Sequence, residues 1–308
     1  MSMESDVLRI LKIIVDTITR VRKEDRILLI VDNSTEFLVN ELGNILYGNE
    51  TKVLQLSQEL NLSDEIIKDR DVIFVFTKEN LCFSKNIVKA VKIGKKVLCC
   101  AKCTPSKLVR SIPENLGYYH DLTKKLVSAF MPNSYFELIS RQGHKLTGQI
   151  DKFPPKYVGF LIDSEHNFSI LPGGIIGVPI IPRTVNGEIL INGFVERIGQ
   201  ISIPLLLKIK EGNVKVVNSS DSPISFLETV SSPWFKPCEL GIGTNPNSKT
   251  SEDTHESESE LGAVDIGFGE NKHIGGPIGG SSHFDVTTKG ATLYIDTKLI
   301  VKEGEIRV

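Results

Sequence analysis

The residues best suited to chemistry lie together in the stretch LGAVDIGFGENKHIGGPIGGSSHFDV, residues 261–286. Carboxylate and imidazole groups, which bind divalent metal ions in proteins, stand here among glycines: Asp265, Glu270, His273, His283 and Asp285. His283 and Asp285 are two residues apart in an alternating run, so in a strand both side chains project from the same face. Glycine lets a backbone approach a ligand closely, although a plain hairpin can also be rich in glycine. The stretch therefore predicts a metal site.

The region around this stretch has the sequence pattern of a β domain. After about residue 132, short β-rich runs such as YFELIS, EILIN and ISIPLLLKI are separated by Gly, Pro and Asn. One helix is expected around residues 223–232. We expect residues 133–308 to form a mainly antiparallel β (α+β) domain that carries the metal site.

The first part of the chain has a different pattern. Continuous apolar runs at 26–31, 71–76 and 95–100 alternate with segments of helical period. Strands buried on both faces and joined by helices are typical of parallel sheets. We therefore expect an open doubly wound α/β domain over residues 1–132. No phosphate-binding loop follows any of its strands, and GIGTNP at 241–246 lies outside any strand–helix unit.

Composition excludes several classes of function. The chain has 308 residues, is 40% hydrophobic and has a net charge of -2, so nothing favours binding to nucleic acid or to an anionic membrane. No apolar run is long enough to span a bilayer, and the acidic N-terminus does not resemble a signal peptide. We expect a cytoplasmic protein. Cys100 and Cys103 are interpreted as small buried residues rather than as a redox or zinc pair.

Two further segments are not expected to contribute catalytic residues. Residues 247–257 are polar and acidic, which is typical of a mobile surface loop, and His255 within it is expected to be solvated. Ser281 and Ser282 precede His283, but no nucleophile-elbow sequence accompanies them, so a serine-hydrolase function is not favoured.

The order of motifs in the C-terminal region resembles that of a known family. ELGIGTNPNS, a run of glutamates, LGAVDIGFGENKHIGG, SSHFDV and ATLYIDTKLIVKEGEI follow one another. This order is similar to that in the thermophilic metallo-aminopeptidases of the aminopeptidase T and aminopeptidase S type, over essentially the whole chain. The resemblance implies a homodimeric metalloprotease, a hydrolase that uses divalent metal (Zn, Co, Mn or Fe) to remove N-terminal residues from a peptide or to act on another small substrate.

The resemblance also implies roles for individual residues. Glu239 falls on a metal-binding glutamate of the family, and His283 and Asp285 fall on its paired ligands. The sequence departs from the pattern at Gly174, where the family has a glutamate, and at Asp265, where it has a histidine. Further candidates are His273 as a metal ligand and Glu258 or Glu260 as the general base for a metal-activated water.

These departures leave two alternatives open. A carboxylate is a harder metal ligand than an imidazole, so replacing histidine by aspartate favours oxygen-loving ions over zinc. Two histidines with one carboxylate form the ligand set that binds ferrous iron in oxygenases. The same scaffold is similar to that of an iron-dependent dioxygenase that cleaves dihydroxypyridine rings, so such an enzyme is one alternative. A homologue that has lost its metal ligands and its catalysis is the other.

Overall fold

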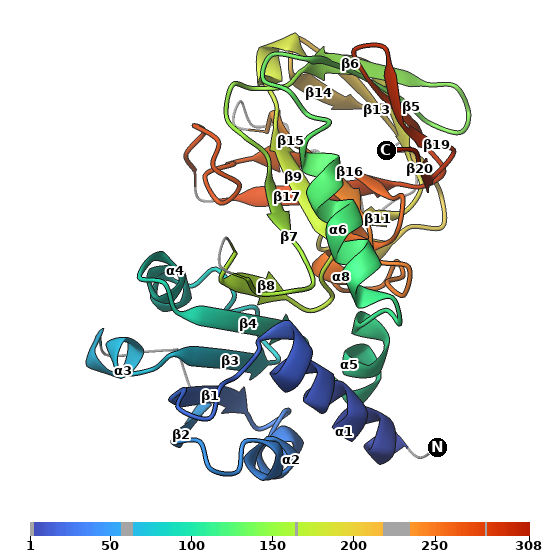
Figure 1. Cartoon of the computed structure of the whole chain (residues 1–308). Coiled ribbons are helices and arrows are strands. Elements are labelled where there is room, and N and C mark those ends of the chain that lie inside the picture. Colours follow the sequence, from blue (N-terminus) through green and yellow to red (C-terminus); the bar gives the residue numbers. More distant parts are fainter. Residues whose placement is uncertain (1–2, 57–63, 164–165, 218–234, 281) are drawn as a thin grey trace. The chain divides into compact units, whose positions relative to one another are not determined.

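The computed structural model describes residues 3–56, 64–163, 166–217, 235–280 and 282–308 (Figure 1). The chain forms two compact units: Met1–His120 with Val158–Gly173, and Asp121–Tyr157 with Gly174–Val308. This grouping differs from the predicted division at residues 132/133, because residues 121–132 belong to the second unit and residues 158–173 belong to the first. The helix predicted around residues 223–232 and the residue Ser281 lie outside the described residues.

The first unit contains a parallel sheet of five strands in the order β2-β1-β3-β4-β8. Its strands are β1 (Ile27–Asp32), β2 (Thr51–Leu56), β3 (Val72–Thr77), β4 (Lys96–Ala101) and β8 (Phe168–Ile170). The central strands β1, β3 and β4 are the continuous apolar runs of the sequence, and they are buried almost throughout because helices cover both faces of the sheet.

Strand β8 explains why residues 158–173 return to the first unit. It pairs in parallel with β4, with Val97 opposite Phe168 and Cys99 opposite Ile170. The edge of β4 would otherwise leave backbone N–H and C=O groups unpaired. A segment that follows strands of the second unit thus completes the first sheet, which no local sequence pattern indicates.

Two apolar clusters flank the first sheet. Side chains on one face of β1 and β3 pack with helix α1, and those on the other face pack with α4. The helices of this unit are α1 (Met3–Ile13) with the π-helical turn η1 (Ile14–Ile18), α2 (Phe37–Ile45), α3 (Asp64–Lys68), α4 (Lys85–Lys92) and α5 (Pro105–Ser111). Cys99 and Cys100 belong to opposite clusters, and all five cysteines are buried free thiols, as expected for Cys100 and Cys103. Helix α6 (Leu116–Val127) contains the boundary between the units.

The second unit contains two sheets, which confirms the predicted fold class. The eight-stranded sheet has the order β14-β13-β10-β6-β5-β18-β19-β20, and the seven-stranded sheet has the order β12-β11-β17-β16-β15-β9-β7. The strands are β5 (Tyr135–Ile139), β6 (Lys145–Gln149), β7 (Lys156–Val158), β9 (Ile175–Pro179), β10 (Asn186–Ile191), β11 (Phe194–Val195), β12 (Gly199–Gln200), β13 (Leu205–Lys210), β14 (Asn213–Val216), β15 (Pro237–Gly243), β16 (Val264–Gly269), β17 (His283–Thr288), β18 (Thr292–Ile295), β19 (Lys298–Lys302) and β20 (Glu305–Ile306). The short helices η2 (Pro182–Thr184) and α8 (Thr254–Ser259) complete the unit.

The two faces of the seven-stranded sheet differ in chemistry. One face joins the main apolar core of the unit through Leu240, Ile242, Val264, Ile266, Phe268, Phe284 and Val286. The residues that alternate with these along β15, β16 and β17 are glycines, carboxylates, one imidazole and Thr287. Helix α8 packs against β15 and β17. The alternation of the strands therefore separates an apolar face from a polar face that is nevertheless buried.

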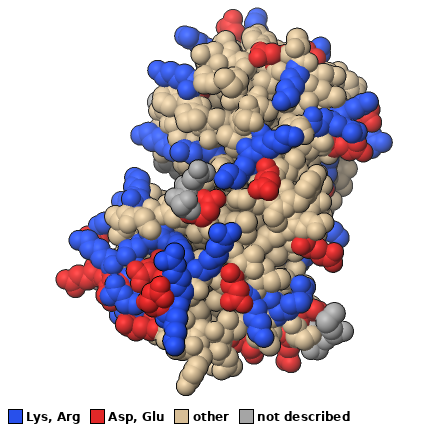
Figure 2. Space-filling model, viewed as in Figure 1, with Lys and Arg blue, Asp and Glu red and all other residues tan. Residues whose placement is uncertain are grey.

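Charge on the surface is mixed. Figure 2 shows lysine and arginine side chains interspersed with aspartate and glutamate over the visible face, which agrees with the net charge of -2. Within the described part of the chain, no helix combines the length and apolar character needed to cross a membrane.

Candidate metal centre

The polar face of the seven-stranded sheet is built around glycines. In the strand register, Glu239 of β15 is opposite Gly267 of β16, and Gly267 is opposite Asp285 of β17. A Cβ atom on Gly267 would lie 2.7 Å from Cε1 of His283 and 2.9 Å from both Oδ1 of Asp285 and Cβ of Glu239. Gly267 therefore leaves the space in which three predicted site residues meet.

Two other glycines clear space in the same way. A Cβ on Gly177 of β9 would overlap the carboxylate of Glu239, and a Cβ on Gly241 of β15 would overlap the carboxylate of Asp265. Gly177 and Gly241 are register partners on neighbouring strands. Gly177 and Gly241, which lie outside residues 261–286, thus have a steric role: because they lack side chains, the carboxylates of Glu239 and Asp265 can lie against the sheet face.

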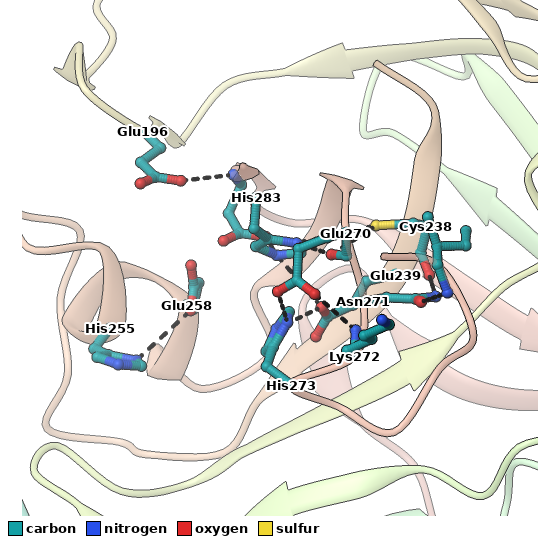
Figure 3. A network of polar contacts seen from close by, with 12 residues as sticks. Glu196, Cys238, Glu239, His255, Glu258, Glu270, Asn271, Lys272, His273 and His283 are labelled. Carbon is teal, nitrogen blue, oxygen red and sulfur yellow. Dashed lines mark hydrogen bonds and ion pairs between the residues drawn. The ribbon is translucent and has the colours of Figure 1, made fainter. Parts of the chain in front are cut away.

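Three predicted ligands converge above this face (Figure 3). Glu239, His273 and His283 each offer one ligand atom, and these atoms lie within 4.8 Å of one another. Nε2 of His273 and Nε2 of His283 lie 3.3 Å and 3.4 Å from Oε2 of Glu239. His273 comes from the glycine-rich loop after β16, whereas Glu239 and His283 come from strands. Folding thereby joins residues that are far apart in the sequence.

Glu270 orients both imidazoles. Its carboxylate oxygen Oε1 lies 3.0 Å from Nδ1 of His273, and its backbone carbonyl oxygen lies 2.6 Å from Nδ1 of His283. With Nδ1 occupied in each ring, the two Nε2 atoms face Glu239. Contacts of this kind fix the ring orientation of metal-binding histidines in known sites.

Asp285 is the fourth group at this centre. Its Oδ1 lies 2.9 Å from Nε2 of His283, and its backbone N–H donates to Oε2 of Glu196 at 3.1 Å. Burial lowers the pKa of His283, but the charge of Asp285 and the hydrogen bond to it outweigh this effect, so the pKa of the imidazole is raised. His283 in turn holds the pKa of Asp285 low against the effect of burial.

Asp265 and Glu258 add two buried carboxyl groups on the same side of the sheet. Burial and the neighbouring charge of Asp285 raise the pKa of each well above its ordinary value. Glu258 also forms a hydrogen bond with the side chain of Asp285. Both residues are therefore part of the same electrostatic cluster as the three convergent ligands.

Glu258 reaches the cluster because the acidic segment is folded, contrary to the prediction of a mobile loop. Asp253 accepts a hydrogen bond from the N–H of His255 and caps helix α8, and the helix buries residues 256–259. His255 is only partly exposed, with Nδ1 3.9 Å from Oε2 of Glu258. Internal hydrogen bonds from Ser251 and Ser257 replace the apolar contacts that the sequence lacks here.

Two sequence positions lie in other environments. The carboxylate of Glu260 forms an ion pair with Nζ of Lys289 at 2.7 Å and accepts hydrogen bonds from Thr250. Gly174 has φ +94° and its carbonyl accepts a hydrogen bond from Thr244. Glu260 is thus held in a network with Lys289 and Thr250.

The residues present fit a divalent cation. Oε2 of Glu239 is buried and has no hydrogen bond of good geometry from any described residue, and the same holds for Oε1 of Glu258 and Oδ1 of Asp265. Buried carboxylate oxygens without partners are costly unless a cation neutralises them. Two imidazoles and a carboxylate with further oxygen donors nearby suit an ion of intermediate hardness such as ferrous iron.

Sequence reasoning missed several residues that support the site. Glu196 lies 89 residues from Asp285 along the chain, and the thiol of Cys238 lies 4.0 Å from Nδ1 of His283. Burial raises the pKa of Cys238 to about 11, so this group is a neutral thiol. The orienting role of Glu270 and the packing of Asn271 were also not predicted. Only the i,i+3 spacing of Glu270 and His273 gave a local signal.

Fold and site together define a class: an α/β unit joined to an antiparallel β unit that carries a two-histidine, one-carboxylate centre. The profile of the 2,5-dihydroxypyridine 5,6-dioxygenase (NicX) family matches residues 33–308, and the chain belongs to this family. This protein is metal-dependent, as are the dioxygenases of its family. A search of curated proteins found no match.

Two solved structures have the same fold. The 2,5-dihydroxypyridine dioxygenase of Pseudomonas putida superposes with a TM-score of 0.79 at 13% identity, over 100% of this chain and 98% of that chain. Wild-type AmpT of Thermus thermophilus superposes with a TM-score of 0.74 at 10% identity, over 100% of both chains. At these identities the likeness concerns the fold.

The family assignment corrects the activity predicted from the sequence. The prediction of a hydrolase, aminopeptidase and metalloprotease is wrong, because the matched family is one of dioxygenases and the structure from Pseudomonas putida is that of a dioxygenase. The resemblance to aminopeptidase T is a likeness of fold. Motifs shared across a scaffold do not determine one chemistry, because function depends on the site residues.

Proposed function

We propose that this protein is an iron(II)-dependent dioxygenase that opens the ring of a hydroxylated pyridine. The observation that carries the proposal is the convergence of Glu239, His273 and His283, whose ligand atoms lie within 4.8 Å of one another. Two imidazoles and one carboxylate form the set that non-haem ferrous oxygenases use. Membership of the dihydroxypyridine dioxygenase family supports both the reaction class and the substrate class.

The side chains of the centre have distinct proposed roles. Glu239, His273 and His283 hold the ion, and Asp285 is placed to join them because its Oδ1 faces Nε2 of His283. Ferrous iron held by this set supplies the redox chemistry with dioxygen that amino-acid side chains lack. Asp265 remains a proposed additional oxygen donor, since its buried Oδ1 has no partner among the described residues.

Glu258 is the proposed acid–base group. It is buried, forms a hydrogen bond with Asp285 and has a raised pKa, first through burial and then through the charges of Asp285 and Asp265. A carboxyl group whose pKa is raised toward the working pH can both accept and return a proton. The hydroxyl group of a dihydroxypyridine is a suitable proton donor for it.

Metal content and oxygen uptake test the proposal together. Protein prepared without oxygen and reconstituted with ferrous iron should bind iron and consume dioxygen when 2,5-dihydroxypyridine is added, with loss of the aromatic absorbance. His283→Ala should abolish both iron binding and oxygen uptake. His144→Ala is the matched control, because Nδ1 of His144 lies 3.5 Å from Oε2 of Glu188 in the same unit, and neither residue belongs to the candidate metal centre. Absence of iron binding by the wild-type protein would refute the proposal, and so would iron binding without oxygen uptake on any hydroxypyridine.

The assembly and location of the protein stay predictions. The resemblance of the sequence predicts a homodimer, and light scattering on the purified protein measures its mass directly.

A further inference from the structure

The loop that carries His273 is organised around one buried amide. Residues 270–280, here called the His273 loop, follow strand β16. The side chain of Asn271 is fully buried within this loop. Loops normally satisfy their polar groups with water, so an asparagine whose side-chain amide is buried and bonded within the protein indicates a specific structural role.

Both ends of the Asn271 amide are used. Oδ1 accepts a hydrogen bond from the N–H of Ile278 at 2.9 Å, and Nδ2 donates to the carbonyl oxygen of Cys238 at 2.9 Å. The Asn271 backbone adds two more bonds, donating to the Ile278 carbonyl at 3.0 Å and accepting from the N–H of Gly276 at 2.9 Å. One residue thus closes the loop on itself and ties it to strand β15.

The loop is packed tightly against this amide. A Cβ atom on Gly276 would overlap Cγ, Oδ1 and Nδ2 of Asn271. Within the loop, Gly275 has φ +89° and its N–H donates to the carbonyl of Lys272, which forms the turn that contains His273. The glycines at 275 and 276 are therefore required by the backbone conformation and by the approach to Asn271, respectively.

The position of His273 depends on this arrangement. Its Nε2 lies 3.3 Å from Oε2 of Glu239, and Glu239 directly follows Cys238, the residue whose carbonyl Asn271 binds. The bond from Asn271 to Cys238 thus fixes the distance between the His273 loop and the strand that supplies the carboxylate ligand. A ligand on a loop needs such support, because a shift on the order of 1 Å is enough to spoil a metal site.

We infer that Asn271 is a positioning residue of the metal centre: it holds the His273 loop in the conformation that presents Nε2 of His273 to the ion. The inference rests on the proposed metal site. It predicts that Asn271 affects metal affinity only through His273.

Titration with Co²⁺ against a competing chelator tests this prediction. Asn271→Ala is expected to lower Co²⁺ affinity about 10- to 100-fold, as loss of an outer-shell contact does in known sites. In a double-mutant cycle, Asn271→Ala should have no further effect when His273→Ala is already present, because coupled residues are not additive. The visible spectrum of bound Co²⁺ should change in the same way in both single variants.

A matched control separates positioning from stability. Asn192 closes another turn in the same unit, with Oδ1 accepting the N–H of Lys289 at 2.7 Å and Nδ2 donating to the Lys289 carbonyl at 3.2 Å. Asn192→Ala should lower the midpoint of thermal unfolding but leave Co²⁺ affinity at the wild-type value. If Asn271→Ala does not fold, Gly276→Ala displaces the same amide and is used in the same cycle.

The outcomes distinguish this inference from the proposed function. If His273→Ala weakens Co²⁺ binding and neither Asn271→Ala nor Gly276→Ala does, the positioning role is refuted and the metal site stands. An Asn271 effect that persists in full in the His273→Ala background also refutes it. If His273→Ala and His283→Ala both bind Co²⁺ like the wild type, the metal site itself is wrong.

Discussion

The carboxylate of Glu270 lies 3.0 Å from Nδ1 of His273, three residues further along the chain. The carbonyl oxygen of the same Glu270 lies 2.6 Å from Nδ1 of His283, which arrives on the neighbouring strand. One residue therefore orients two imidazoles, one through its side chain and one through its backbone. Side-chain substitution can remove only the first of these contacts.

This difference makes Glu270→Gln informative. Glutamine keeps a hydrogen-bonding group near His273 but removes the negative charge that makes the imidazole a better ligand. We expect iron or Co²⁺ affinity to fall about 10-fold or more, with the contact to His283 retained. Glu137→Gln, which breaks a surface ion pair with Lys145 in the same unit, is the control. Equal metal affinities in the two variants would contradict the orienting role.

Gly267→Ala tests the steric requirement of the sheet face. The new Cβ would lie 2.7 Å from Cε1 of His283 and 2.9 Å from Oδ1 of Asp285, so these side chains must shift. We expect metal affinity to fall strongly and the free energy of unfolding to fall by about 1–3 kcal/mol, as for overpacking in other cores. Chelator titration and denaturant unfolding measure the two effects.

Gly43→Ala is the matched control for that variant. Gly43 lies within helix α2, and a Cβ there meets no atom within 4 Å. Alanine is preferred to glycine inside helices, so Gly43→Ala should raise the free energy of unfolding by roughly 0.4–1 kcal/mol. Tolerance of both substitutions would show that the glycines of the polar face have no steric role.

Much of the first unit could be predicted from the sequence. Strands buried on both faces read as continuous apolar runs, and β1, β3 and β4 lie within one residue of the expected runs. The pairing of β8 with β4 could not be predicted, because the two strands are far apart in the sequence and their pairing is set by tertiary structure. Secondary structure is local, whereas the order of strands in a sheet is not.

The candidate site was predictable only in part for a related reason. The spacing of His283 and Asp285 placed both on one strand face, since side-chain direction along a strand has a period of two. The opposition of Glu239, Gly267 and Asp285 follows from strand register, which tertiary packing sets. Placement of His273 depends on hydrogen bonds within its own loop, and these leave no periodic pattern.

Glu258 and Glu260 can be separated by substitution with glutamine. Glu258→Gln resembles the protonated form that burial and the charge of Asp285 favour, so we expect near wild-type stability and metal content. If Glu258 transfers protons, kcat should fall by about 100-fold or more. Glu260→Gln should instead lower stability, because it breaks the ion pair with Lys289, and should leave kcat of the folded enzyme unchanged.

The opposite pattern would reassign the acid–base role. A large loss of kcat in Glu260→Gln, with wild-type kcat in Glu258→Gln, would mean that the network of Glu260 and Lys289 rearranges when substrate binds. Measurement of kcat and metal content on the same preparations keeps loss of iron from being mistaken for loss of proton transfer.

Asp32 links pH to the stability of the first unit. Burial raises its pKa, but hydrogen bonds from Ser34, from the Lys78 N–H and from Thr35 outweigh this effect and hold the pKa below its ordinary value. A carboxyl whose pKa is lower in the folded state stabilises the fold above its unfolded pKa, and this contribution is lost as the pH falls through the folded pKa. The bond to Lys78 joins the end of β1 to the end of β3.

Asp32→Asn should therefore destabilise the protein at neutral pH by on the order of 1 kcal/mol, because charge-assisted hydrogen bonds are stronger than neutral ones. The difference from wild type should stay constant from about pH 7 to pH 5 and shrink below about pH 4, near the unfolded pKa of aspartate. Thermal unfolding across this range measures it, with Asp121→Asn at an exposed position as the control. A difference that is independent of pH would mean that Asp32 acts through its shape alone and not through its charge.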